Sequence, residues 1–181
     1  FINKYHGKYL RRGADRIIGT TKKHTISSGV TEPAEQVDTT SVYRSDFVVR
    51  DEVTSVSTTG RNSASVTNRI RRGKIDSSGE VTINMTFTNN DDITITSAKD
   101  EPLTITEGSG KFVKDGDQWG GKNRDVIYIE YQYQEKDTIV IEQSRGRPTV
   151  LSYIDLKHEV KDTLVIRNRD VKFEEFSIDF E

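Results

Sequence analysis

The 181-residue sequence contains no cysteine, only three prolines, one methionine and one tryptophan. Without cysteine the chain forms no disulfides, thiolate nucleophiles or cysteine-based zinc sites. The sequence also lacks a run of about 18 apolar residues, which a membrane-spanning helix requires. The missing disulfides do not indicate a compartment, because a domain of this length can bury enough apolar surface without covalent cross-links.

An excess of charge of either sign is also absent. The 27 basic and 29 acidic residues leave a formal net charge of -2. This balance provides no broad attraction to nucleic acid or anionic membranes, so we expect neither as a partner. One local basic run could bind phosphate or sulfate, but it is more typical of a solvated turn between strands. It consists of Arg69, Arg71, Arg72 and Lys74.

Recognised catalytic and metal-binding motifs are missing as well. His6, His24 and His158 are far apart in the sequence, and none belongs to an HxH or HExxH pattern. We interpret them as ordinary surface or turn histidines. The sequence has no GxSxG nucleophile motif and no glycine-rich phosphate loop between a strand and a helix.

The acidic residues do not define a catalytic site on their own. Pairs drawn from Asp115, Asp117, Glu130 and Glu142 could serve glycoside hydrolysis, but chain spacing does not establish the separation that this mechanism needs. The run from Asp115 to Asp117 resembles the start of a calcium loop, yet Val126 stands where an EF-hand requires glutamate. We therefore expect no catalytic residues, no metal, no cofactor and no enzymatic activity.

Thr, Val, Ile and Ser are abundant while only 32% of residues are hydrophobic, which is typical of strands with one solvated face. The most regular alternation of apolar and polar residues covers 80–88, and it resumes over 92–97 after a turn-forming run. We predict a hairpin here, with the apolar residues of its first strand in the core. Those residues are Val81, Ile83, Met85 and Phe87.

Short strand patterns recur along the chain, and no window shows an amphipathic helix. We expect a long loop over 20–35, and either an edge strand or a tail over 171–181. The pattern predicts one all-β domain over 1–181, an antiparallel meander that closes into a lipocalin-like (calycin-like) barrel, with a β-sandwich as the alternative. The predicted strands are 4–10, 41–50, 52–58, 64–70, 80–88, 92–97, 102–106, 110–114, 126–134, 138–143, 149–156 and 162–168.

An aromatic stretch provides the candidate ligand-binding residues. Trp119 precedes two glycines, and in the strand that follows Tyr128 and Gln132 share one face. Aromatic rings stack on sugar rings while their polar tips remain hydrated. We take Trp119, Tyr128 and Gln132 as the candidate glycan contacts. Two other interpretations remain open: Trp119 could close one end of a barrel, and the strand could present an ordinary mixed sheet face.

Three segments resemble the carboxy-terminal domain of certain Bacteroidetes surface lipoproteins of uncharacterised families. They are FINKYHGKYLRRG, EGSGKFVKDGDQWGGKNRDVIYIEYQYQ and DTLVIRNRDVKFEEF. The resemblance implies a lipocalin-like barrel that follows an upstream domain, at the cell surface or outer membrane. It also implies genes encoded beside glycan importers of the starch-utilisation type. Because the sequence begins at Phe1 rather than Met, we expect any export signal or lipid anchor to lie upstream.

Together these observations lead to one expected function and one alternative. We expect a non-enzymatic extracytoplasmic domain of a surface lipoprotein that binds glycan during polysaccharide capture. The alternative is a structural or adhesion module that mediates protein contact. Oligomeric state and ligand identity have no signature in the sequence.

Overall fold

The computed structural model describes residues 2–43, 52–71, 79–98 and 103–169. Within these ranges the chain forms strands and no helix, so the all-β prediction is confirmed. Accordingly, no helix in these ranges is long and apolar enough to cross a membrane. The strands are β1 (Gly7–Thr25), β2 (Val30–Thr31), β3 (Glu35–Tyr43), β4 (Glu52–Gly60), β5 (Ser63–Arg69), β6 (Glu80–Phe87), β7 (Asp92–Ser97), β8 (Ile105–Trp119), β9 (Lys122–Ser144) and β10 (Arg147–Asn168).

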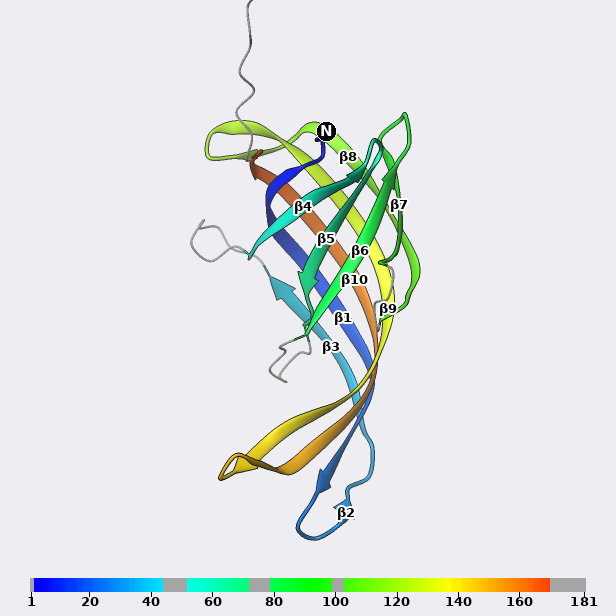
Figure 1. Cartoon of the computed structure of the whole chain (residues 1–181), viewed down its shortest axis with the longest axis vertical. Helices are drawn as coiled ribbons and strands as arrows, with labels where there is room; N and C mark the ends of the chain where they lie inside the picture. Colours follow the sequence, from blue (N-terminus) through cyan, green and yellow to red (C-terminus); the bar gives the residue numbers. More distant parts are fainter. Residues whose placement is uncertain (1, 44–51, 72–78, 99–102, 170–181) are drawn as a thin grey trace, which may run out of the picture.

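The strands form one antiparallel sheet whose ends meet in a ring. From β4 to β10 each strand pairs with the next along the chain. Strand β1 then pairs with β4 on one side and β10 on the other, which closes the ring (Figure 1). The predicted meander is therefore observed, because hairpin connections place sequential strands side by side.

Below the ring the sheet opens into a projecting extension, visible as the long twisted lower part of Figure 1. Strand β1 changes partner along its length, since Gly7–Arg11 pairs with β4 and Gly13–Thr21 pairs with β3. We call the sheet made by the lower parts of β9, β10, β1 and β3 the extension. It consists of 134–144, 147–160, 13–25 and 35–43.

The predicted strand boundaries are wrong where a long strand was divided. The pairs 102–106 with 110–114, 126–134 with 138–143, and 149–156 with 162–168 are single strands, β8, β9 and β10. The charged residues at their midpoints resemble turns in sequence, but the strands continue through them. Some, such as Lys136, point to the solvated outer face, and others, such as Glu135, are hydrogen-bonded in the interior. The predicted 20–35 loop is also partly strand, because β1 runs from Gly7 to Thr25. Positions 44–50 and 171–181 lie outside the described residues.

The interior of the ring is filled by large side chains, as expected for a small barrel. The predicted core residues of β6 are buried, with exposures of 1% for Val81, 0% for Ile83, 0% for Met85 and 2% for Phe87, so this prediction is confirmed. Tyr5 stacks on the ring of Phe87 at a centroid distance of 3.5 Å. A smaller cluster of Ile17, Ile154 and Leu156 continues the interior face into the extension.

Candidate functional site

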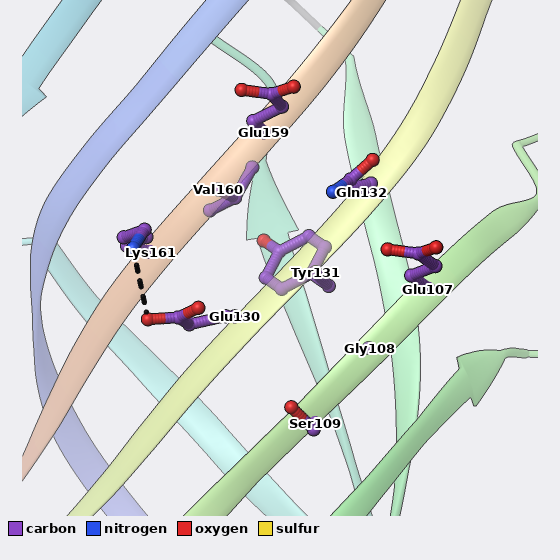
Figure 2. Close-up of a pocket in the computed structure, with 9 residues that line it drawn as sticks. All are labelled: Glu107, Gly108, Ser109, Glu130, Tyr131, Gln132, Glu159, Val160 and Lys161. Atoms are coloured by element: carbon purple, nitrogen blue, oxygen red, sulfur yellow. Dashed lines mark ion pairs between the residues drawn. The ribbon is translucent and has the colours of Figure 1, made fainter.

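A shallow groove crosses the outer face of β8, β9 and β10 (Figure 2). Its cavity volume is about 310 Å³, which lies at the lower end of the range for small-molecule sites. We call it the β8–β10 groove. Its lining consists of Glu107, Gly108, Ser109, Glu130, Tyr131, Gln132, Glu159, Val160 and Lys161.

Strand register places the polar side chains of the groove in two rows. Gln132 of β9 is paired with Glu107 on one side and Glu159 on the other. In the second row Glu130 is paired with Ser109 and with Lys161. Directly opposite residues lie on the same face with Cβ atoms about 5 Å apart. Adjacent strands therefore present carboxylate, amide, hydroxyl and ammonium groups to one open surface, as Figure 2 shows.

Two of the three carboxylates in the groove have cationic partners. Lys161 Nζ lies 3.2 Å from Glu130 Oε1, and Lys157 Nζ lies 2.9 Å from Glu159 Oε1. The hydrogen bond from Lys157 lowers the pKa of Glu159. The groove thus presents carboxylate oxygens that accept hydrogen bonds, together with donors from Gln132 and Lys161.

The structure brings two of the predicted site residues to one face of β9. Gln132 lies in the groove, and Tyr128 lies on the same outer face beyond Glu130, with 39% of its surface exposed. The Tyr128 hydroxyl donates a 3.4 Å hydrogen bond to the carbonyl of Gly116. Tyr128 is therefore positioned beside the groove rather than in its lining.

Trp119 lies apart from Tyr128 and Gln132, at the turn between β8 and β9. It is half-buried at the end of β8, next to Gly120 and Gly121, whose positive φ angles form the turn into β9. The guanidinium of Arg124 covers its indole at 4.7 Å, and Arg124 Nε donates to the Trp119 carbonyl at 3.1 Å. The strand partner of Trp119 is Lys122, which is about 20 Å along β9 from Tyr128 at the usual rise per residue.

The interior contains a polar cluster that the sequence analysis missed. His158 is 0% exposed, so the assignment of all three histidines to surfaces or turns is wrong for this residue. Its Nδ1 lies 2.7 Å from Asp15 Oδ2 and its Nε2 lies 2.9 Å from Glu135 Oε2. The imidazole also stacks on Tyr133 at 4.4 Å. The signal was the alternation of β10, in which His158 falls on the inward positions shared by Leu156 and Val160.

The cluster alters the protonation of its members. Burial by itself lowers the pKa of His158, but the hydrogen bonds and charges of Asp15 and Glu135 outweigh it, and the pKa is raised. Burial raises the pKa of Asp15, although His158 opposes this shift. Only the protonated imidazole can donate from both nitrogens. The two carboxylates therefore favour the imidazolium form.

A second buried network lies two inward positions nearer the start of β1, at Arg11. Arg11 Nε lies 2.8 Å from Asp162 Oδ2 and its Nη1 lies 3.1 Å from Glu52 Oε1, while the Tyr43 hydroxyl donates to Asp162. Burial tends to raise the pKa of Glu52, but Arg11 and Arg71 outweigh it and the pKa is lowered. These bonds satisfy charges that would be very unfavourable if buried alone.

Arg71 belongs to this network, which corrects the prediction that the basic run is a solvated turn. Its guanidinium pairs with Glu52 and lies 4.5 Å from the ring centroid of Tyr43. Arg72 and Lys74 lie outside the described residues. Across the ranges that the structure describes, no group of three or more His, Asp or Glu side chains is arranged to hold a metal ion.

Comparison with known proteins shows similarity to chains of unknown function. A Bacteroides ovatus protein of unknown function is 25% identical with a TM-score of 0.66, and the match covers 94% of this chain and 44% of that one. A multidomain B. ovatus protein that includes DUF1735 is 16% identical with a TM-score of 0.35, covering 91% of this chain and 49% of that one. This chain thus spans less than half the length of these proteins. No curated protein matches it. A family model matches residues 4–170, and the chain therefore belongs to the family described as a domain of unknown function, DUF5627.

Proposed function

We propose that this chain is a non-enzymatic, extracytoplasmic glycan-binding domain of a surface lipoprotein, and that the glycan occupies the β8–β10 groove. The observation that carries this proposal is the pair of polar rows across β8, β9 and β10. Sugar hydroxyls both donate and accept hydrogen bonds, so they suit a surface that presents both kinds of group.

Each polar side chain of the groove, and Tyr128 beside it, offers a different contact to a glycan. The Gln132 amide both donates to and accepts from sugar hydroxyls, and the carboxylates of Glu107 and Glu130 accept from them. Tyr128, exposed on the same face, offers an aromatic surface for the apolar side of a neighbouring ring. An open groove of this kind suits an internal stretch of a polysaccharide better than a fully enclosed small molecule.

The cellular setting is part of the proposal. Its support is the sequence resemblance to Bacteroidetes surface lipoproteins, together with the similarity to a B. ovatus chain that extends well beyond the matched region. On this view an upstream part of the same protein carries the anchor, and the present domain contributes to capture of polysaccharide at the outer membrane.

Glycan-array screening of the chain, followed by titration of each hit against single variants, tests the proposal. Gln132→Ala should weaken binding by about tenfold, because one central hydrogen-bonding residue contributes about 1–2 kcal/mol. Tyr128→Ala should weaken it by a smaller factor. If no glycan binds, or if neither substitution changes the affinity, the groove is not a glycan site.

Trp119→Ala distinguishes the groove from the β8–β9 turn. If Trp119 dominates binding, as the sequence analysis predicts, its truncation should lower affinity by about 2 kcal/mol. A loss in this variant with no loss in Gln132→Ala would move the site to the turn. Circular dichroism of each variant provides the control for folding.

A second candidate function, protein contact, is favoured by the outer face of the extension. Val140 and Tyr153 expose 39% and 40% of their surface there, and Val140 is paired with the half-buried Leu151. Exposed apolar side chains grouped in this way are typical of interaction surfaces. Binding of the separately expressed upstream part to the chain, and its loss in Tyr153→Ser, would favour this function.

A further inference from the structure

One edge of the extension is a strand that is paired on one side alone. Strand β9 pairs with β8 as far as Tyr133, and beyond that residue its pairing is with β10. In the part of the chain that the structure describes, no strand pairs with the opposite side of 138–144. We call this segment the β9 edge. It lies in the projecting yellow hairpin in the lower part of Figure 1.

The β9 edge lacks the residues that commonly keep an exposed edge from pairing with another chain, which are Lys, Pro and the bulges that twist a strand away. Its sequence is TIVIEQS, in which Glu142 is the single charged residue. The register shifts opposite it lie in β10, and β9 itself continues as an unbroken strand. By contrast, β3, at the other edge of the extension, carries Glu35 and Asp38. The β9 edge is therefore a template for the addition of a strand.

Apolar side chains are exposed on both faces of the β9 edge. Val140 points to the outer face and is 39% exposed, whereas Ile141 points to the opposite face and is 37% exposed. A partner that docked on one face of the sheet would leave the other side chain in water. An added strand covers both, because its own side chains alternate between the two faces.

The sequence of the β9 edge is self-complementary in an antiparallel pair. With a two-fold axis at Val140, this residue lies opposite Val140 of the second copy, and Ile139 lies opposite Ile141. Thr138 then lies opposite Glu142. Opposite residues share a face, so this register places apolar side chains together on both faces and brings no like charges together. An axis at Ile141 would instead place Val140 opposite Glu142.

An antiparallel arrangement also places the two rings far apart. Strand β9 runs from the ring to the tip of the hairpin (Figure 1). In an antiparallel pair of β9 strands, each ring therefore lies towards the hairpin tip of the other copy. The sheet of the extension continues from β9 of one copy into β9 of the other.

We propose that the chain forms a symmetric dimer through the β9 edge, in which a second copy of the chain supplies the added strand. Hydrogen bonds between the two backbones provide the attraction, as in other cases of strand addition, and the exposed side chains of Val140 and Ile141 become covered. The pairing is isologous, so it closes after two copies and does not propagate into a fibre. The dimer does not depend on glycan binding in the β8–β10 groove.

Sedimentation of the chain over a range of concentrations tests the dimer. The monomer has a mass of 20.6 kDa, and the mean mass should rise towards twice this value as concentration increases. Val140→Lys places two ammonium groups opposite each other at the axis and should return the chain to a monomer. The matched control is Tyr153→Lys, which changes a side chain of similar exposure on β10, one strand away from the edge. This variant should still dimerise. Circular dichroism checks the folding of both variants.

Single-cysteine variants determine the register of the pair. The native chain has no cysteine, so mild oxidation can link only the introduced residues. Opposite residues have Cβ atoms about 5 Å apart, which is close enough for a disulfide. Val140→Cys should therefore form a covalent dimer. Thr138→Cys alone should not, because the two copies of residue 138 are separated by about 14 Å along the strands. A mixture of Thr138→Cys and Glu142→Cys should cross-link.

The proposal is wrong if the chain sediments as a monomer at every concentration. A dimer that persists in Val140→Lys, or that is lost in Tyr153→Lys, would show that another surface makes the contact. Cross-linking of Thr138→Cys as readily as Val140→Cys would exclude the register centred on Val140. Glycan titrations report the β8–β10 groove independently, so failure of the dimer leaves the proposed function intact.

Discussion

His158 and Asp15 are 143 positions apart in the chain, yet the imidazole Nδ1 and the carboxylate Oδ2 lie 2.7 Å from each other. The antiparallel pairing of β1 with β10 produces this contact, because His158 is opposite Ile17 and Asp15 is opposite Val160. The two residues are diagonal neighbours on the interior face, within reach of each other's side chains. The contact therefore belongs to the strand pair that closes the ring.

We predict that His158→Leu destabilises the protein by about 3–5 kcal/mol, because it leaves the buried carboxylates of Asp15 and Glu135 without their shared partner. Urea denaturation measures the loss. His24→Leu is the matched control: His24 is half-exposed and hydrogen-bonds only to Thr31 in the described structure, so its loss should be below about 1 kcal/mol. Equal losses in the two variants would contradict the importance of the buried cluster.

The stability of the protein should fall as pH rises above neutrality. The pKa of His158 is raised above its ordinary value of 6.5, so the folded chain binds this proton more tightly than the unfolded chain. The resulting stabilisation is complete below about pH 6.5 and is lost as pH rises through the raised pKa. The pKa of Asp15 is also raised in the folded state, so its contribution has the same sign, but it begins to be lost as pH rises above the ordinary value of 3.8.

Urea denaturation at a series of pH values from about 6 to about 9 checks this prediction. His158→Leu should remove most of the dependence on pH in this range, because the group that titrates is gone. An NMR titration of the His158 ring should show protonation persisting above pH 6.5, its ordinary value. A lower His158 pKa than this would contradict the prediction.

Gly13→Ala should destabilise the protein by about 2 kcal/mol or more, because β1 and β10 approach too closely here for a side chain. An added Cβ would lie 2.6 Å from Asp162 Oδ1 and closer still to the Lys161 carbonyl. Gly60→Ala is the control, since its nearest neighbour is the Ser63 hydroxyl, which can rotate away. Thermal unfolding compares the two variants. A loss in Gly13→Ala no larger than in Gly60→Ala would argue against tight contact at this point.

Arg124→Ala should expose Trp119 and loosen the β8–β9 turn. Arg124 covers the indole and donates to the carbonyls of Trp119, Ile166 and Arg167 at 3.0–3.1 Å. Because Trp119 is the only tryptophan, fluorescence reports its surroundings directly. We expect a shift of emission to longer wavelength and a loss of about 1–2 kcal/mol in stability. Unchanged emission would mean that the indole is already solvated.

The sequence predicted those parts of the fold that depend on neighbouring residues. The alternation over 80–88 correctly indicated which side chains of β6 face the core, because successive residues of a strand point to opposite faces. The same rule placed Tyr128, Glu130 and Gln132 on the outer face of β9. It failed at strand ends, since a charged residue such as Lys136 is compatible both with a turn and with the outer face of a continuous strand.

The sequence by itself thus determined the all-β class, the meander and the alternation of faces, because these follow from local periodicity and turn residues. Tertiary structure alone decided which distant residues meet: the register of β1 with β10 joined Asp15 to His158, and the registers of β8, β9 and β10 aligned the polar rows of the groove. It also separated Trp119 from Tyr128 and buried His158. The physical reason is that register and ring closure are set by contacts summed over whole strands, whereas the sequence pattern of one strand is compatible with many partners.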